Sequence, residues 1–498
     1  MMRVKALLLP MALALLMSGC VVGPNYVKPA PPMLSEAKLR EVERAAQARI
    51  SAQPLPDHWW QLYNDPELDR LVGEALKSNT DLRVAAANLL RARAVLMEQR
   101  GARLPTFSPN AQVTRQQGNS ANAAAFGGAN GAARTFQFDL FQLNLDASYE
   151  IDLFGGVTRA IQAGRGDVEA SAAQLDAARV SVAAETTRAY VTACGNAAQL
   201  AVARETVDLQ RKTTELTQRL FTAGRGTRRD VEQADVLLAQ TEALVPQLEA
   251  ERRAALYALA TLTGRPAEQV DAAADRCVAV PQIDQPIPAG DGAALIARRP
   301  DVRAAERTLA ADTARIGIAV SQLYPRIQLL GRIGLNAIRG SQLFEPTSVN
   351  YSVGPLISWT FPNQTVARAR IRQARAQAEA SLARFDGAVL TALNETEQAL
   401  ARYAGALDQR DALLRAEKAS TEAARLTRIR FDSGLDNFLQ LIQAERDRAN
   451  ARAAHAQADA AVAAAQVALF RALGGGWEKA PMPERRMVEG QPANGAQP

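Results

Sequence analysis

Two long stretches of this chain have the composition and spacing of helices. Residues 156–221 and 364–431 are rich in Ala, Arg, Glu and Gln, with few glycines. In the second stretch leucine recurs every seventh residue, from Leu393 to Leu414, which is the heptad pattern of packed helices. Roughly 65 residues at ~1.5 Å per residue give a helix of about 100 Å, several times the diameter of a small domain. A return helix over 229–262 should be kinked by Pro246.

Shorter stretches alternate between apolar and polar residues, which predicts β-strands. One covers 351–361, and another covers 136–149, where the apolar parity changes after Leu140 and indicates a β-bulge. Their expected antiparallel partners are residues 107–118 and 326–337. The strands are long enough to cross an outer membrane, for which about 9–11 residues are needed. A soluble β-sandwich is the alternative, and the alternation alone does not decide between the two.

Four strands cannot form a closed barrel by themselves. An open strand edge cannot lie in lipid, because its backbone groups would have no hydrogen-bond partners there. The smallest useful closed barrels have about eight strands. If these strands are transmembrane, several copies of the chain must therefore share one barrel.

The sequence contains an internal duplication. Phe221-Thr222-Ala223-Gly224 matches Phe431-Asp432-Ser433-Gly434 at an offset of 210, and Leu262-Thr263-Gly264 matches Leu473-Gly474-Gly475 at 211. Each copy is expected to contain a helix, two strands, a very long helix and a return helix. The first copy carries extra residues between its strands, which fit the loop-like tract Gly118 to Ala133.

The first twenty residues have the pattern of a bacterial lipoprotein signal. Arg3 and Lys5 precede an apolar run, 6–17, that is shorter than the ~20 residues a membrane-spanning helix needs. Met17-Ser18-Gly19-Cys20 resembles a lipobox, in which Cys20 becomes the acylated first residue of the mature chain. Val21 is compatible with delivery to the outer membrane. An ordinary signal peptide with an incidental Cys20 is the alternative.

Composition excludes several classes of function. The chain has 58 Lys+Arg against 52 Asp+Glu, no basic block and 5% aromatic residues, which argues against a nucleic-acid partner. Two His and three Cys leave too few side chains for a His-based triad or a multi-ligand zinc site, so we expect no catalytic residues and no metal site. Cys194 and Cys277 could pair in an exported protein. Their spacing does not show it, and two unpaired structural thiols is the favoured interpretation.

Five short motifs occur in order along nearly the whole mature chain: Gly19-Cys20-Val21-Val22-Gly23-Pro24-Asn25-Tyr26, Trp59-Trp60, Tyr149-Glu150-Ile151-Asp152-Leu153-Phe154-Gly155, Arg298-Arg299-Pro300-Asp301 and Leu473-Gly474-Gly475-Gly476-Trp477. In combination they resemble the outer-membrane factor lipoproteins of tripartite efflux systems, in the NodT/OprM-like branch of the TolC-like outer membrane efflux proteins.

The resemblance and the duplication together divide the chain into six parts. We expect a lipoprotein signal peptide (1–19), an N-terminal linker and anchor segment (20–75), a first efflux repeat (76–265), an inter-repeat linker (266–295), a second efflux repeat (296–477) and a disordered tail (478–498).

The resemblance implies a mainly α fold with a membrane β-barrel portion. Three copies would form a shared twelve-stranded barrel in the outer membrane and an α-helical barrel across the periplasm. It implies a passive exit channel, not an enzyme, for drugs or toxic compounds. A periplasmic adaptor and an inner-membrane transporter, commonly of the resistance-nodulation-division type, would be the partners. No cofactor is implied beyond a covalent diacylglycerol and an N-acyl chain on Cys20.

The sequence leaves two alternatives to this function to consider. A duct for protein or metal-ion export is one, and the sequence identifies neither the cargo nor the transporter and adaptor. A periplasmic coiled-coil adaptor is the other, but it would need a compact β-rich domain, which no continuous segment supplies.

The two breaks between long and return helices are expected to form the periplasmic tips. The resemblance places them against the adaptor, and a plain helical hairpin turn is the alternative reading. The expected contact residues are Gly224, Gly226, Gly434 and Leu435.

Just inside the tips, the resemblance places a ring of side chains at an aperture. Its positions fall on Leu439, Gln440 and Gln443, with Arg446 one turn further on. Relatives often carry acids at one or both of the glutamine positions, so the neutral residues here weaken the case for a cation-binding aperture.

Asp230 and Asp436 are the acids expected at the aperture, and Glu445 is close to them in sequence. Each of the three can also be interpreted as a solvated charge at a helix end. Asp230 is the counterpart of Gln440 in the first repeat. We hypothesise that Leu439 forms an apolar constriction, and that Asp230 and Arg446 tie neighbouring helices together in the closed state.

Overall fold

The structure, a computed structural model, describes residues 21–29, 50–51, 53, 55–119, 135–283, 285–288 and 298–484. The expected signal, Cys20, most of the tract 118–133 and residues 485–498 of the expected tail lie outside the described residues. The chain divides into two units. Unit 1 comprises 1–29, 91–169 and 306–383, and unit 2 comprises 30–90, 170–305 and 384–498. Each unit therefore combines segments from both copies of the duplicated sequence.

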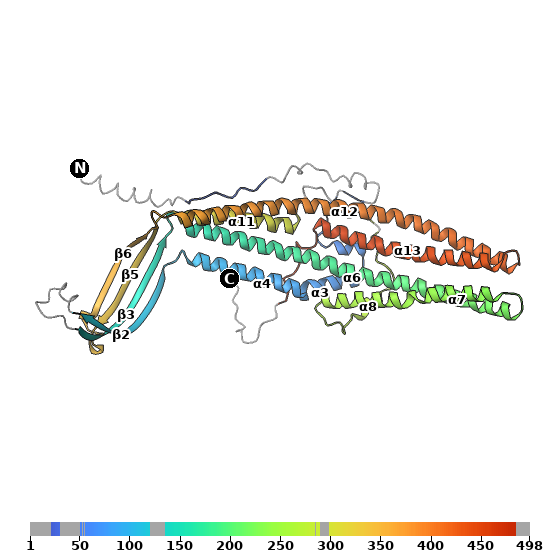
Figure 1. Cartoon of the computed structure of the whole chain (residues 1–498), viewed down its shortest axis with the longest axis horizontal. Coiled ribbons are helices and arrows are strands. Elements are labelled where there is room, and N and C mark those ends of the chain that lie inside the picture. The colour runs from blue at the N-terminus through green and yellow to red at the C-terminus, as the bar shows by residue number, and fades with distance from the viewer. Residues whose placement is uncertain are drawn as a thin grey trace, which may run out of the picture. The chain divides into compact units, whose positions relative to one another are not determined.

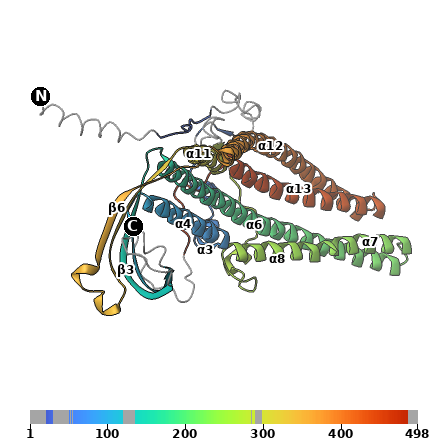
Figure 2. The ribbon, with the colours of Figure 1, turned by 60° about the vertical axis from the view of Figure 1, so that its left-hand side comes forward.

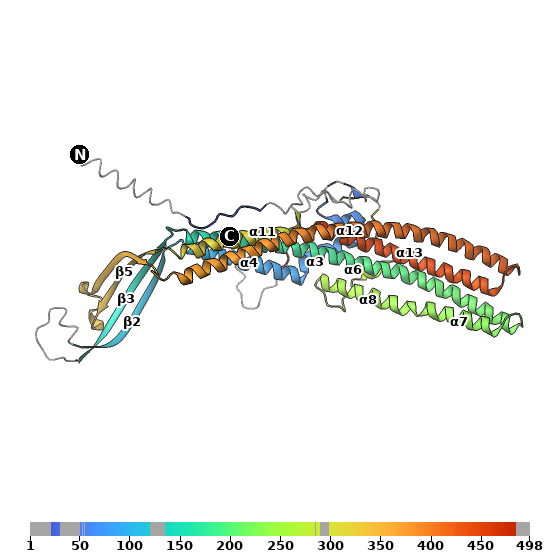
Figure 3. The same cartoon turned by 45° about the horizontal axis from the view of Figure 1, so that its top comes forward.

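Unit 1 contains a four-stranded antiparallel sheet (Figure 1). The strands are β2 (Thr106–Asn119), β3 (Thr135–Ile151), β5 (Arg326–Ala337) and β6 (Val349–Ser358), in the order β2-β3-β5-β6. All four were predicted, β3 and β6 from their alternating pattern and β2 and β5 as the antiparallel partners of those strands. Among the described residues, β2 and β6 each have a strand partner on one side only, so the sheet has two unpaired edges (Figure 3).

The register of the sheet separates apolar from polar residues. Cross-strand partners are always both odd-numbered or both even-numbered, as in Leu145 with Pro109 and Ile333, so each parity marks one face. The even-numbered face is mainly polar and includes an Arg332–Asp146 ion pair, with Nε and Oδ1 2.6 Å apart. The odd-numbered face is apolar over all four strands: Phe107, Pro109, Ala111 and Val113; Phe141, Leu143, Leu145, Ala147, Tyr149 and Ile151; Ile327, Leu329, Gly331, Ile333, Leu335 and Ala337; and Val349, Tyr351, Val353, Pro355 and Ile357.

The predicted bulge in β3 is wrong. β3 pairs with β2 without interruption from Thr135 to Ser148, and its pairing with β5 is equally regular. The parity change after Leu140 instead marks the end of the apolar face. Beyond it, the odd-numbered positions of β2 and β3 carry Arg115 opposite Asp139. The strand continues for several residues past the apolar band, where its outward side chains no longer have to be apolar.

The long helices have nearly the predicted ends. α6 spans Gly156–Thr222 and α12 spans Thr365–Asp432, and both run from unit 1 into unit 2. In unit 2, α7 (Arg228–Glu242) and α8 (Leu244–Leu262) return beside α6, and α13 (Phe438–Leu473) returns beside α12 (Figures 1 and 2). The remaining longer helices are α3 (Pro66–Ser78), α4 (Thr80–Gly101) and α11 (Pro300–Ser321).

The return helix of the first repeat is broken where Pro246 requires it. α7 ends at Glu242 and α8 begins at Leu244. Proline has no amide to donate to the carbonyl four residues earlier, and its ring crowds that same carbonyl. For Pro246 that residue is Glu242. The second repeat has no proline in this helix, and α13 is continuous over 36 residues.

Three of the motifs meet in unit 2. Trp59 is fully buried and stacks on Phe470, with ring centroids 4.6 Å apart. The buried Arg299 donates to the carbonyl of Ala472 (Nη1–O 3.0 Å) and lies against Gly474, which ends α13 with φ 69°. A Cβ on Gly474 would lie 2.9 Å from Arg299 Cγ. These motifs therefore form a packed junction and hold the end of α13.

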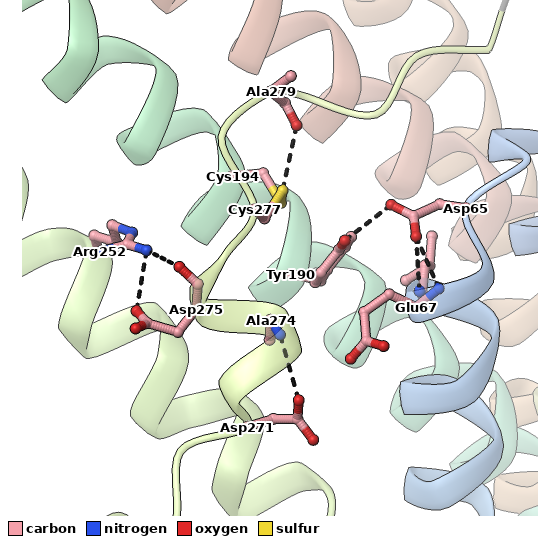
Figure 4. The surroundings of a disulfide bond; sticks show 11 residues. Asp65, Glu67, Tyr190, Cys194, Arg252, Asp271, Ala274, Asp275, Cys277 and Ala279 are labelled. Atoms are coloured by element: carbon pink, nitrogen blue, oxygen red, sulfur yellow. Dashed lines mark hydrogen bonds and ion pairs between the residues drawn. A yellow bond between two sulfur atoms is a disulfide. The ribbon is translucent and has the colours of Figure 1, made fainter.

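Cys194 and Cys277 form a disulfide (Figure 4). The favoured prediction of two unpaired thiols is therefore wrong. Cys194 is a buried residue of α6, and Cys277 follows the short helix α9 (Ala272–Asp275), which lies in the chain that connects the repeats. Asp271 caps α9, and Arg252 of α8 forms an ion pair with Asp275 (Nη2–Oδ1 3.0 Å). These contacts bring Cys277 to α6, which sequence spacing does not reveal.

Candidate functional site

The two predicted tips have the same backbone structure. At the first, the amide of Gly224 donates to the Phe221 carbonyl (3.0 Å) and that of Arg225 to the Leu220 carbonyl (2.8 Å). At the second, Gly434 and Leu435 make the corresponding bonds to Phe431 and Arg430, both at 2.9 Å. This is the Schellman arrangement that closes a helix C-terminus. The duplication predicted from sequence therefore extends to individual hydrogen bonds.

The glycine that follows each long helix, Gly224 or Gly434, has the left-handed backbone conformation. Gly224 has φ 71° and Gly434 has φ 73°, and a Cβ added to either would meet no atom within 4 Å. Glycine is thus required there by backbone conformation and not by lack of space. Gly226 does not have a positive φ. Backbone conformation therefore does not require glycine at position 226, as it does at position 224.

The return helices begin with matching capping boxes. Thr227 precedes α7, and its amide donates to Asp230 Oδ2 (2.9 Å) while the Asp230 amide donates to Thr227 Oγ1 (3.3 Å). Asn437 and Gln440 make the equivalent pair of bonds before α13, at 2.9 and 3.0 Å. The structure thus bears out the correspondence of Asp230 and Gln440. It also gives both side chains a local structural role, because each satisfies an unpaired amide at a helix start.

Three predicted aperture residues lie together. Leu439, Gln440 and Gln443 line one side of an open groove of about 830 Å³ between α12 and α13. The opposite side is formed mainly by the small residues Ala416, Ala419, Ser420 and Ala423 of α12. Gln443 donates to Asp447 of the same groove, with its amide nitrogen 2.9 Å from Oδ1. Leu439 is 43% exposed.

The charged residues assigned to the aperture are not brought together within the chain. Asp436 accepts two hydrogen bonds from Arg430, both 2.9 Å long, and thereby braces the second tip. Asp230 is engaged in its capping box, and Arg446 is exposed and forms no ion pair with the described residues. No Asp230–Arg446 ion pair exists inside one copy, so the hypothesised tie would have to join different copies.

A buried carboxylate near the groove is not the solvated charge that sequence suggested. The side chain of Glu445 is 1% exposed and lies between Arg428 of α12 (Oε1–Nη2 2.9 Å) and Arg448 of α13 (Oε2–Nη2 2.8 Å). Its burial could have been inferred from the sequence, because Glu445 lies four residues after Leu441 and so on the same face of α13, and Leu441 is fully buried. This ion-pair set joins the two helices just behind the second tip.

The two tips present different chemistry despite their common backbone. The first carries Arg225, Arg228 and Arg229, all exposed or partly so. The second presents Leu435, which is 69% exposed, and Leu439. A partner that contacts both tips therefore meets one basic and one apolar surface.

Neither a metal centre nor a membrane-spanning helix is found among the described residues. No group of three or more His, Cys, Asp or Glu side chains is placed to hold a metal ion. No described helix combines the length and the apolar character that crossing a membrane requires.

The sheet with one apolar face and the two long helical hairpins define the class, a protein that combines a sheet suited to lipid with water-exposed helices. The model of a family described as outer membrane efflux protein matches residues 71–265 and 293–475. The outer membrane protein OprJ of Pseudomonas aeruginosa is 32% identical over 94% of this chain and 95% of its own. The toluene efflux pump outer membrane protein TtgI of Pseudomonas putida is 28% identical, over 94% and 98%.

A solved structure of the outer-membrane channel OprN superimposes with a TM-score of 0.83 at 36% identity, covering 92% of this chain and all of that one. The chain therefore belongs to the outer membrane efflux protein family, in the NodT/OprM-like branch that the motifs indicated. It is an outer-membrane exit channel of the tripartite efflux type, it extends into the periplasm, and it is not an enzyme. The predicted family, fold class and function are confirmed.

Proposed function

We propose that three copies of this chain pair β2 of one with β6 of the next and so close a twelve-stranded barrel. The sheet supports this proposal, because its odd-numbered face carries an apolar band on every strand, while β2 and β6 have no strand partner on their outer sides within the described part of the chain. An apolar face suits lipid, and only closure satisfies the two edges there. Three copies of four strands exceed the minimum of about eight.

We further propose that the channel releases small toxic or drug-like molecules, delivered by a periplasmic adaptor and an inner-membrane transporter of the resistance-nodulation-division type. The relative TtgI is by name part of a toluene efflux pump, which supports small apolar cargo. The tips at Gly224, Gly226, Gly434 and Leu435 are proposed to contact the adaptor, and their exposed basic and apolar surfaces suit a protein partner.

The gate is proposed to lie at Leu439, Gln440 and Gln443, with Asp230 and Arg446 joining neighbouring copies in the closed state. One side chain per copy becomes a ring under threefold symmetry, so Leu439 would form an apolar constriction. Because Asp230 already caps α7 through one oxygen, its contact with Arg446 would add a charge interaction to an existing structural role.

The anchor is proposed to be a diacylglycerol and an N-acyl chain on Cys20. Several chains give stable attachment where a single chain is marginal. Labelled fatty acid should enter the wild-type chain and be absent from C20A.

Transport is tested in a bacterium deleted for its own outer-membrane efflux channels. This chain is expressed there with each of several adaptor and transporter pairs of the resistance-nodulation-division type, and accumulation of a hydrophobic fluorescent dye is measured. We expect lower accumulation than in cells that carry the adaptor and transporter alone. Unchanged dye accumulation together with altered metal content or protein secretion would instead establish the export alternative.

A further inference from the structure

The residues just after Cys20 follow a fixed path across unit 1. Arg159, in the first turn of α6, is 3% exposed and points its guanidinium at this segment. Its Nε donates to the Val22 carbonyl, and its Nη2 donates to the Gly23 carbonyl and to Asn25 Oδ1, all at 3.0 Å. Its Nη1 donates to Gln162 Oε1 at 2.9 Å. Every nitrogen of the guanidinium is therefore used, three of the four bonds going to residues 22–25.

Glycines let the segment lie directly on the backbone beneath it. Gly23 has φ 87°, and a Cβ there would lie 2.5 Å from the Cα of Gly317 in α11. A Cβ on Gly317 would lie 2.7 Å from Arg159 Cγ. Gly155, with φ 75°, faces Val21 in the same way, at 2.8 Å from its Cα. Real Cβ atoms do not approach this closely, so side chains larger than hydrogen would displace the segment.

A second attachment lies a few residues further on. Tyr26 donates its hydroxyl to Glu306 Oε1 (3.1 Å), and Lys28 forms an ion pair with Glu306 Oε2 (3.2 Å). Burial and the neighbouring Glu306 carboxylate raise the pKa of Tyr26 to about 12. The phenol therefore stays a hydrogen-bond donor at any physiological pH.

This path places the start of the mature chain beside the end of a membrane strand. The amide of Val22 donates to the Phe154 carbonyl (3.3 Å), between the last residue of β3, Ile151, and the first residue of α6. Ile151 is also the last apolar residue on the odd-numbered face of β3. Val21 directly follows Cys20, so acyl chains on that cysteine would enter lipid where the apolar face ends.

We infer that Gly155, Arg159, Glu306 and Gly317 form a docking site for the acylated N-terminus, here called the N-terminal cradle. It holds residues 21–28 beside the end of β3, so a lipid attached one residue before Val21 would be kept close to the sheet. Arg159 is its positioning residue. This inference rests on the proposed acylation of Cys20.

Hydrogen exchange on the full-length acylated protein, purified from outer membranes in detergent, tests the cradle. Arg159→Met keeps the length of the side chain but removes its donors, and we expect exchange of the Val22 amide, which donates to the Phe154 carbonyl, to rise at least tenfold. Arg159→Lys keeps the charge but cannot reach three acceptors, so it should give an intermediate rise. Arg165→Met is the matched control, because Arg165 is exposed on the same helix and forms no ion pair with the described residues.

Three further measurements separate the outcomes. If Arg159→Met does not assemble, Gly23→Ala, which changes only the docked segment, should give the same increase in exchange. Exchange of the Val22 amide at the wild-type rate in both variants would overturn the cradle, and so would rapid exchange of that amide in the wild type. Fatty-acid labelling reports on the acylation, and channel conductance of the same preparations reports on the proposed function.

Discussion

Asp230 and Gln440 occupy the same position in the two repeats, each as the residue that completes the capping box of a return helix. One side chain is an acid and the other a neutral amide, yet both accept a hydrogen bond from the N-cap amide at 2.9 Å. The charge of Asp230 is therefore not needed for the cap. This allows its structural and its proposed gating role to be separated by substitution.

Asp230→Asn should leave the α7 cap intact and remove the charge, because the amide oxygen can still accept from Thr227. Single-channel conductance in planar bilayers should rise in this variant, and also in Arg446→Ala. Thr227→Ala removes the cap and keeps the charge, so it should lower local helix stability by about 1 kcal/mol without opening the channel. Unchanged conductance in the first two variants would rule out the ion-pair gate.

Gly224→Ala and Gly434→Ala should each destabilise a tip by about 1–2 kcal/mol, because each forces Cβ into a left-handed conformation. Gly224→Asn is the matched control, since asparagine tolerates this conformation better, and its cost should be clearly smaller. Hydrogen exchange of the helix ends measures the effect. Equal exchange in the alanine and asparagine variants would contradict a conformational cause.

Leu145→Arg should strongly reduce the amount of assembled channel in the outer membrane. Leu145 lies near the middle of the apolar face of β3, where an arginine facing lipid costs about 2–4 kcal/mol. Ser148→Arg, in the same strand but on the polar face, should assemble almost normally. Heat-resistant oligomer on gels compares the two variants, and equal yields would mean that the apolar face does not meet lipid.

Asp271 should make stability depend on acid pH. Burial acts to raise its pKa, but hydrogen bonds from Arg70, two backbone amides and Arg265 lower it from 3.8 to about 2. The lowered pKa means that its stabilising contribution is complete above pH 3.8 and is lost as the pH falls towards 2. After allowance for solvent screening of this partly exposed group, the difference corresponds to about 1–2 kcal/mol.

The wild type should therefore lose part of its thermal stability between pH 4 and pH 2, and Asp271→Asn should lose less over this range while being less stable at pH 7. Glu268→Gln, at an exposed neighbouring position, serves as the control and should follow the wild type. Circular dichroism melts at several pH values measure this. Identical pH dependence of thermal stability in all three proteins would show that Asp271 does not cause the loss of stability in acid.

The Cys194–Cys277 disulfide predicts no free thiol in the unfolded, acylated protein before reduction and two after it. Cys277→Ser should lower the free energy of unfolding by about 2–4 kcal/mol. The comparison requires denatured samples, because Cys194 is buried in the native fold. Two thiols without reductant would show that the bond does not form.

Much of the fold could be predicted because it depends on periodicity. The ends of α6 and α12, the four strands and the breaks at the tips follow from local pattern, and Pro246 explains the gap between α7 and α8. The disulfide could not be predicted, because it depends on where an aperiodic linker returns to α6. The roles of Asp230 and Glu445 also needed three-dimensional partners, since one acid turns back to cap its own helix and the other is buried between two arginines from different helices.

The disulfide also bears on which thiols are left to react. The chain has three cysteines, and Cys194 and Cys277 follow one another in sequence with no cysteine between them. A lipid linked to the sulfur of Cys20 would prevent this third cysteine from forming a disulfide. The maturing polypeptide would then have only one possible disulfide, so lipid attachment to Cys20 would also prevent a mispaired bond between α6 or the inter-repeat linker and the N-terminus.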